Sequence, residues 1–298
     1  MSEYCLPPSY SEPARQRDLR CCTRQQRRTP RQLRNLVSPT GPRIRVPLNE
    51  SHIRDANASV SCRVALRRIH KIWEWCFITR VLEAEGVLAP GHRGLGFAVG
   101  REPLVAQFAA CGASIVATDL DVDHAAEAGW VGSCEHAASL AVLIERGLCP
   151  ADVLDRSVRL QEVNTLDIPV ARLGEFDFVW SSCAFEHLGS LQAGIDFVVN
   201  SMKCPRPGGL AVHTTEFNVG SNDATRSEGG TVIYRQRDIE DLAATLRSSG
   251  HPIELNFDRG TLPLDYHVDV PPYTHDPHLK LHLMGYTTTS VGIVIRHK

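Results

Sequence analysis

Residues 94–103 read Gly-Leu-Gly-Phe-Ala-Val-Gly-Arg-Glu-Pro, and the apolar run Ile115-Val116-Ala117-Thr118 that follows them ends on Asp119. Small residues at positions 96, 98 and 100 let the backbone approach a ligand closely, and the amides that open the next helix then face that ligand. An acid about 20 residues further on, at the end of a second strand, is placed to bind ribose hydroxyls. The pattern indicates an adenosine-type cofactor if the turn lies between a strand and a helix.

Around this turn, apolar β-branched stretches alternate with stretches of helical periodicity. Strands are predicted at 93–95, 115–119, 158–163, 176–180, 209–214, 252–257 and 287–296, and helices at 60–86, 103–112, 134–147, 191–202 and 237–249. Nearly continuous apolar strands separated by helices are typical of a parallel sheet that is covered on both faces. We therefore predict a three-layer α/β fold.

The composition is that of a folded protein with a distinct N-terminal segment. The 298 residues are 43% hydrophobic and carry a net charge of −2, which fits one sizeable core with an appendage. Residues 1–55 are rich in Arg, Pro, Gln and Ser, and their prolines interrupt any helix. We predict a disordered extension over 1–55 and one domain over 56–298. A basic nucleic-acid-binding arm and an organelle-targeting peptide are the alternatives for the extension.

Several classes of protein are disfavoured by the sequence. No apolar run reaches the roughly 18 to 20 residues of a membrane span, and the N-terminus lacks the apolar stretch of a secretory signal, so we expect a soluble, cytoplasmic protein. The near-neutral charge makes nucleic acid an unexpected partner. The ten cysteines include no Cys-x-x-Cys pair, so neither a zinc site nor a disulfide framework is predicted.

Two further motifs follow the turn and Asp119 in the chain. One is Phe176-Asp177-Phe178-Val179-Trp180-Ser181-Ser182-Cys183-Ala184-Phe185-Glu186-His187-Leu188, and the other is Pro205-Arg206-Pro207-Gly208-Gly209-Leu210. Together, in this order, the four motifs resemble class I S-adenosylmethionine-dependent methyltransferases over roughly residues 60–298. The resemblance implies a Rossmann-like fold with a mostly parallel seven-stranded sheet, helices on both faces, and S-adenosyl-L-methionine as cofactor. A dinucleotide oxidoreductase would share the turn and the acid, but it gives no reason for the two later motifs.

The resemblance also implies the residues that bind the cofactor. Gly96, Phe97, Ala98 and Gly100 would form the cofactor loop, Asp119 would bind the ribose and Leu120 would lie against the adenine. Asn164, followed by Thr165, would meet the adenine amino group, with Asp167 as the rival for that position, and Ser181 would border the methionine part.

Two positions depart from the family pattern. The family usually carries an acid two residues before its first glycine, where this chain has Gly94, and its middle glycine is replaced by Ala98. Alanine is tolerated there if its backbone has negative φ. Glu102 is the candidate for replacing the missing acid, and the alternative for Glu102 is a first-turn acid that the helix dipole favours.

Three residues are candidates for a general base. His187 and His213 follow from their places at strand ends, and Glu216 follows His213 in the same stretch, although a hydrogen-bonded structural histidine is the alternative for both histidines. Asp and His residues also gather in segment 265–282, but its prolines break any helix that could align metal ligands. No metal is predicted, and this segment is expected to line or cover the acceptor pocket.

These patterns predict methyl transfer to oxygen or nitrogen of a small-molecule or glycan-type acceptor. The alternatives are a nucleic-acid-associated protein that uses the basic arm and a cofactor binder without catalysis. The sequence predicts neither the acceptor nor the oligomeric state, because acceptor specificity lies in variable helices and loops on a common fold.

Overall fold

The computed structural model describes residues 69–133, 135–144, 147–274 and 278–298. All of them belong to one compact unit, Val46–Lys298. The predicted extension lies outside the described residues, so the boundary at residue 55 stays a prediction. No helix among the described residues is both long and apolar enough to cross a bilayer.

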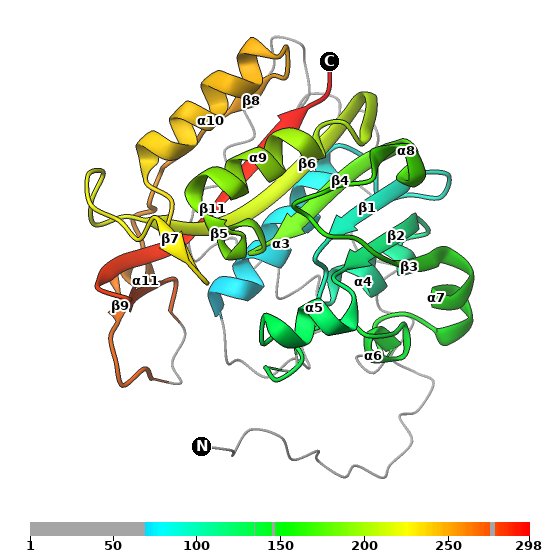
Figure 1. Cartoon of the computed structure of the whole chain (residues 1–298), viewed down its shortest axis with the longest axis horizontal. Helices are drawn as coiled ribbons and strands as arrows, with labels where there is room; N and C mark the ends of the chain where they lie inside the picture. Colours follow the sequence, from blue (N-terminus) through cyan, green and yellow to red (C-terminus); the bar gives the residue numbers. More distant parts are fainter. Residues whose placement is uncertain (1–68, 134, 145–146, 275–277) are drawn as a thin grey trace. The chain divides into compact units, whose positions relative to one another are not determined.

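Helices and strands alternate along this unit (Figure 1). The helices are α3 (Ile69–Ala84), α4 (Leu104–Ala110), α5 (Val122–Glu127), α6 (Ala141–Ile144), α7 (Ala151–Ser157), α8 (Val170–Leu173), the short 3-10 helix η3 (Phe185–His187), α9 (Leu191–Ser201), α10 (Gln236–Ser248) and α11 (Pro263–Tyr266). The strands are β1 (Arg93–Phe97), β2 (Ser114–Asp119), β3 (Val158–Glu162), β4 (Phe176–Ser182), β5 (Gly189–Ser190), β6 (Pro205–Asn218), β7 (Glu228–Gly229), β8 (Ile253–Glu254), β9 (Val268–Asp269), β10 (Lys280–Leu283) and β11 (Tyr286–Arg296).

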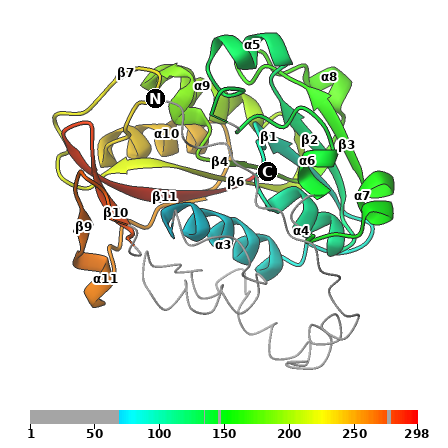
Figure 2. The same ribbon diagram turned by 90° about the horizontal axis from the view of Figure 1, so that it is seen from below.

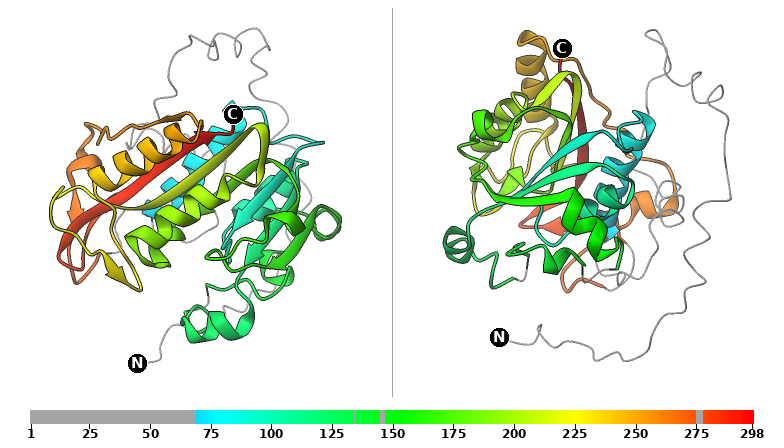
Figure 3. Two further views of the ribbon diagram at one scale, coloured as in Figure 1. Left: turned by 45° about the horizontal axis from the view of Figure 1, so that its top comes forward. Right: turned by 90° about the vertical axis from the view of Figure 1, so that its right-hand side faces the viewer.

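Nine of the described strands form one sheet. Its order is β3-β2-β1-β4-β6-β11-β10-β9, and β8 pairs with another part of β11. The strands from β3 to β6 in this order are parallel, whereas β11 runs antiparallel beside β6 (Figure 3). The predicted Rossmann-like, mostly parallel fold is confirmed, and β9 and β10 raise the number of strands above the expected seven.

Helices cover both faces of this sheet, and each face has its own core. Figure 2 shows α3 and α4 on one face and α9 and α10 on the other. The first core joins α3, α4 and α7 to β2 and β4, and the second joins α9 and α10 to β1, β6 and β11. The alternation of side chains along each strand therefore decides which face a polar residue reaches.

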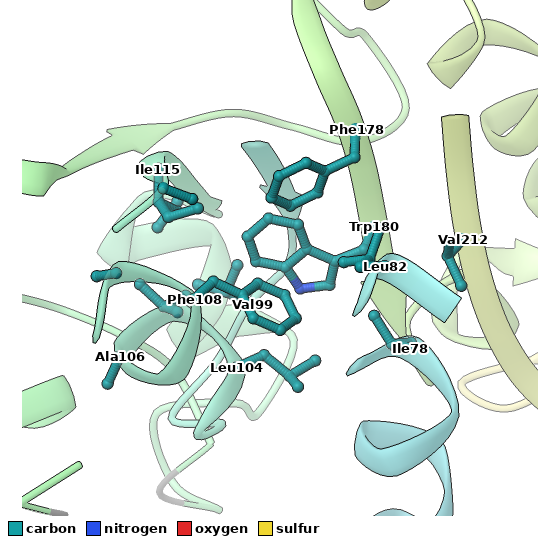
Figure 4. Packing of buried hydrophobic residues seen from close by; sticks show 14 of the residues in the cluster. Ile78, Leu82, Val99, Leu104, Ala106, Phe108, Ile115, Phe178, Trp180 and Val212 are labelled. Atoms are coloured by element: carbon teal, nitrogen blue, oxygen red, sulfur yellow. The ribbon is translucent and has the colours of Figure 1, made fainter. Parts of the chain in front are cut away.

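Two glycines of β1 make room for aromatic rings of β4. A Cβ atom at Gly94 would lie 2.3 Å from Phe178 Cζ, and one at Gly96 would lie 2.5 Å from Trp180 Cζ2. The two rings stack with centroids 5.8 Å apart, and Phe108 of α4 meets both edge-on (Figure 4). The acid that the family resemblance expects at residue 94 is absent for a steric reason, because Phe178 fills the space that its side chain would need.

Two sequence-based expectations about secondary structure are wrong. The first strand continues to Phe97 instead of ending at Leu95, so Gly96 and Phe97 belong to β1 and the loop begins at Ala98. The helix predicted over 134–147 is reduced to α6, and the residues before it form turns and irregular backbone. Backbone groups in that segment bind the loop after β1 and Asp119, and are therefore not available to a helix.

Candidate active site

The candidate site lies where the strand order reverses. β1 is followed on one side by β2 and on the other by β4, so the loops after β1 and β4 diverge to opposite faces of the sheet. Open α/β sheets bind ligands in the crevice at the carboxyl ends of the strands at such a point. The loop after β1 and the end of β4 border this reversal point.

The loop after β1 is held in an unusual backbone conformation. Ala98 has φ +46° and Gly100 has φ +51°, both in the left-handed region. The expectation that alanine is tolerated through a negative φ is wrong, because an L-residue in this region costs about 1–2 kcal/mol. Strain of this kind persists where the surrounding structure imposes it, and it is concentrated at ligand-binding sites.

Asp119 anchors this loop from the end of β2. Its Oδ2 accepts hydrogen bonds from the amides of Gly100 and Ala137, both at 3.1 Å, and its Oδ1 accepts one from Leu120 at 2.9 Å. A carboxylate offers about four lone-pair sites, so three backbone amides leave about one. In this arrangement Asp119 has capacity for one ribose hydroxyl, whereas the sequence predicted that it binds both.

A segment that we call the strap, residues 129–133 and 135–137, lies over the loop and the end of β2. The Arg101 amide donates to the Glu135 carbonyl at 3.0 Å, and His136 Nε2 lies 2.8 Å from the Leu120 carbonyl oxygen. A Cβ atom at Gly100 would lie 2.7 Å from that Glu135 oxygen, so glycine is required there both by space and by φ. The strap therefore fixes the backbone that the resemblance assigns to the cofactor.

His187 lies beside the strap in η3. Its ring meets Trp130 edge-on with centroids 4.8 Å apart, and its Nδ1 lies 2.9 Å from the Gly230 carbonyl oxygen and 3.3 Å from Thr231 Oγ1. The ring is partly exposed, so the structure leaves His187 as a candidate base.

A second group of residues, at the end of β4 on the α3 side, forms what we call the carboxylate cluster. It consists of four glutamates with Lys71, namely Glu74 of α3, Glu102 before α4, Glu186 of η3 and Glu216 of β6. All four glutamate side chains are buried or nearly so. Burying carboxylates is costly unless cations or donors compensate them, so the contacts of each one carry information about function.

Glu74 is the most fully satisfied member of the cluster. Its Oε2 accepts from Ser182 and Thr214, both at 3.2 Å, and lies 3.8 Å from Lys71 Nζ, while its Oε1 accepts from Ser290. Glu74 thus ties α3 to β4, β6 and β11 and keeps α3 over the strand ends.

Glu102 faces the cluster from the cofactor-loop side. Its Oε1 lies 4.0 Å from Lys71 Nζ, and α4 begins only at Leu104. Burial raises the pKa of Glu102 to about 7, although the nearby ammonium of Lys71 lowers it. The side chain contacts α3 across the site, and its position connects the cofactor loop to the carboxylate cluster.

Glu186 and Glu216 keep hydrogen-bonding capacity that no described residue uses. Glu186 Oε2 accepts from Thr215 at 3.0 Å, but Glu186 Oε1 and Glu216 Oε2 are buried without a partner among the described residues. Burial, with the charges of Glu186 and Glu74, raises the pKa of Glu216 to about 8. Cys183, which lies among these groups, has φ +48°, a second strained position at this edge.

Ser181 and His213 lie on the opposite face of the sheet from Glu74 and do not line the carboxylate cluster. Ser181 Oγ lies 2.8 Å from His213 Nδ1, and Ser201 Oγ lies 3.2 Å from His213 Nε2. Burial lowers the pKa of His213 to about 3, and Phe185 and Phe197 pack against its ring. Both ring nitrogens are engaged and the ring is neutral, so this geometry favours the structural alternative for His213. On β4, it is Ser182, one residue further, that faces the cluster.

Asn164 and Thr165 follow β3 beside the end of β2, because the amide of the preceding Val163 donates to the Asp119 carbonyl at 2.8 Å. Asn164 is exposed and its Oδ1 accepts from the Leu166 amide at 2.9 Å, whereas Thr165 is buried. A cavity of about 300 Å³ lies between this loop and α9, lined by Thr165, Leu166, Ala193, Asp196, Phe197, Val199 and Asn200. It shares no residue with the carboxylate cluster.

The described part of segment 265–282 uses its acids locally. Asp269 Oδ2 lies 3.1 Å from His278 Nδ1 and accepts from the Thr274 amide, and Asp265 accepts from the Leu262 amide at 2.7 Å. Among the described residues no group of three or more His, Cys, Asp or Glu side chains is arranged to hold a metal ion.

The sequence-based prediction missed Lys71, Glu74, Ser182 and Glu186 as site residues. Glu186 was visible in the motif after the fourth strand but was assigned no role. A signal for the other two charged residues was present, because Glu74 interrupts the apolar run 72–78 of α3 and Lys71 lies one helical turn before it. A charged residue in such a run is buried and must have a partner.

No protein-family model matches this chain, and no curated protein matches it. Among solved structures, magnesium protoporphyrin IX methyltransferase (ChlM) from Synechocystis PCC 6803 with bound SAH is 11% identical, with a TM-score of 0.49, over 83% of this chain and 94% of that chain. A putative sarcosine dimethylglycine methyltransferase from Galdieria sulphuraria is 14% identical, with a TM-score of 0.49, over 82% of this chain and 98% of that chain. The cyclase SpnF is 18% identical, with a TM-score of 0.42, over 59% of this chain and 57% of the cyclase. All three TM-scores are below 0.5, so these similarities carry no conclusion about function.

Proposed function

We propose that this chain is an S-adenosylmethionine-dependent methyltransferase that acts on oxygen or nitrogen of a small-molecule or glycan-type acceptor. The observation that carries the proposal is the placement, at the reversal point of the sheet, of a strained glycine loop held by Asp119 directly beside the carboxylate cluster. The nucleoside of the cofactor would lie on the glycine loop, and its methionine part would extend toward the carboxylate cluster.

The residues present fit such a cofactor. The left-handed backbone at Ala98 and Gly100 turns the loop, and Asp119 retains about one free lone-pair site for a ribose hydroxyl. In this proposal Leu120 lies against the adenine, and Glu102 takes over the methionine end from the acid that Phe178 excludes at residue 94.

When bound, S-adenosylmethionine supplies a methyl group on a sulfonium that leaves as a neutral thioether, so the chain contributes mainly orientation. Orientation of the reacting groups can supply on the order of 7–11 kcal/mol. A base placed beside the acceptor adds about 10²- to 10⁴-fold. Glu216 and His187 are the proposed bases, because both lie at the carboxyl edge of the sheet and His213 is engaged elsewhere.

The proposal is tested by calorimetric titration of S-adenosylhomocysteine, with NADH as the competing ligand class. Asp119→Ala is expected to weaken S-adenosylhomocysteine binding about 10- to 100-fold, because a hydrogen bond to a charged group contributes about 1.5–3 kcal/mol. The matched control is Asp123→Ala, the removal of an exposed acid on α5, which should leave the affinity unchanged. Unchanged binding in Asp119→Ala, or tighter binding of NADH than of S-adenosylhomocysteine, would contradict the proposal.

A further inference from the structure

We infer that the acceptor of this site is a primary or secondary amine, bound as its ammonium ion by Glu216 and Glu186. The inference rests on the proposed function, whose acceptor class it narrows. It starts from an imbalance of charge and hydrogen bonding in the carboxylate cluster.

The four carboxyl groups of the cluster differ in how many cations and hydrogen-bond donors contact them. Lys71 lies within 4.0 Å of Glu74 and Glu102, and Glu74 also accepts from three hydroxyl groups. Glu186 receives one hydroxyl at Oε2, and Glu216 Oε2 is buried without a hydrogen-bond partner among the described residues. Lys71 acts on Glu186 and Glu216 only from beyond ion-pair distance, so among the described residues these two carboxyl groups have no cation in direct contact.

The two unused oxygens, Glu186 Oε1 and Glu216 Oε2, are buried acceptors. Glu186 is fully buried and Glu216 is 7% exposed, so water cannot freely replace the missing donors. A buried acceptor without a partner costs about 1–3 kcal/mol, and more if it is charged. A ligand that fits these groups must bring donors, and it gains most if it also brings positive charge.

An ammonium group meets both needs. It carries three N–H donors and a unit charge, whereas a hydroxyl supplies one donor and no charge. A metal ion is the other cation to consider, but the described carboxylates are not arranged to hold one. The cofactor's own ammonium does not remove the imbalance, because its proposed partner is Glu102, which also pairs with Lys71 at 4.0 Å.

The same geometry gives Glu216 a chemical task. An ammonium ion has no lone pair and must lose a proton before its nitrogen can form a bond to carbon. Glu216 accepts that proton as its carboxylate becomes a carboxylic acid, which leaves a neutral amine whose lone pair is free. The raised pKa of Glu216, caused by burial and by Glu186 and Glu74 while Lys71 opposes it, makes its carboxylate a stronger base than an exposed glutamate.

The test is a calorimetric titration of matched probes into the full-length protein, with and without saturating S-adenosylhomocysteine. The pairs are glucosamine against glucose, ethanolamine against ethylene glycol, and putrescine against 1,4-butanediol. We expect at least one amine to bind at least tenfold more tightly than its hydroxyl partner. Because burial raises the pKa of Glu216 to about 8, amine binding at pH 7 should also release protons, which is measured by repeating the titration in buffers of different ionisation heat.

Two variants locate the effect. Glu216→Gln, and independently Glu186→Gln in case the first does not fold, should reduce the preference for the amine at least tenfold, and Glu216→Gln should abolish the proton release. Glu254→Gln, which changes an exposed acid on β8, should retain both. Amines that bind no more tightly than hydroxyls, or a preference that survives both variants, would overturn the inference. A protein that binds S-adenosylhomocysteine but shows no amine preference refutes this inference alone, whereas failure to bind S-adenosylhomocysteine refutes the proposed function.

Discussion

Two buried polar clusters lie on opposite faces of the same pair of strands, β4 and β6, and they differ in how completely they are satisfied. On the α9 face, Ser181 and Ser201 each engage one ring nitrogen of His213, and aromatic rings pack against the histidine. On the α3 face, the carboxylate cluster keeps two unpartnered oxygens and several displaced pKa values. A satisfied network stabilises a fold, whereas unused hydrogen-bonding capacity costs stability and is retained where a ligand uses it.

The largest effect is expected from breaking the satisfied cluster. His213→Ala leaves a cavity and removes the partner of two buried serine hydroxyls, so we expect the free energy of unfolding to fall by about 3–5 kcal/mol. Denaturant titration at pH 7.5 measures this loss, and His267→Ala, at an exposed histidine, is the control that should change little. If the loss were below 1 kcal/mol, His213 would not be a structural residue, and its candidacy as a base would return.

The pH dependence of stability should have opposite signs for the two clusters. Folding lowers the pKa of His213 from 6.5 to about 3, so its contribution is lost as the pH falls through that range. Folding raises the pKa of Glu216 from 4.5 to about 8, so its contribution is complete below pH 4.5 and is lost as the pH rises toward 8.

Glu216→Gln, which removes one carboxyl group of the unsatisfied cluster, is therefore expected to stabilise the protein at high pH. At pH 8.5 the variant should be more stable than the parent by about 1–3 kcal/mol, because a neutral amide replaces a buried carboxylate. The difference should vanish near pH 4.5, where the parent glutamate is protonated as well. Melting temperatures of both proteins across this pH range provide the measurement. A variant that is less stable at pH 8.5 would show that Glu216 is already compensated.

The smallest effect is expected at the strained loop that adjoins the carboxylate cluster. Ala98→Gly removes the cost of a left-handed alanine but adds freedom to the unfolded chain, so a net gain of about 0.5–1 kcal/mol is expected. Ala126→Gly, in the right-handed helix α5, should instead lose about 1 kcal/mol, and both are measured by thermal unfolding. Equal losses in the two variants would mean that Ala98 is not strained.

The sequence predicted the fold well because strand-helix alternation and the glycine turn are local patterns. It predicted the contents of the site less well, because burial and side-chain direction depend on register. Ser181 was chosen where its neighbour Ser182 faces the cluster, since a shift of one residue on a strand changes the face. His213 was proposed as a base from its place at a strand end, which does not show that Ser201 of α9 binds its second nitrogen.

The helix predicted over 134–147 was wrong for a related reason. Its residues have good helix propensity, but the Glu135 carbonyl and the Ala137 amide bind Arg101 and Asp119, which lie far away in sequence. Tertiary contacts of this kind override local preference. Glu102 could be proposed from the sequence because its distance from the glycine turn is fixed by the chain, whereas its partner Lys71 lies on a helix that no motif marks.

The interlocked pair Gly94 and Phe178 has a consequence for how this sequence can change over time. An acidic side chain at residue 94 clashes with the ring, and a small residue at 178 leaves a void under α4, so each single step away from the present pair is costly. The present pair can therefore be replaced by an acid at residue 94 only if both positions change together, or if Phe178 is first replaced by a smaller side chain. Among homologues we expect positions 94 and 178 to vary as a pair, with Glu102 free to be lost wherever the acid has returned.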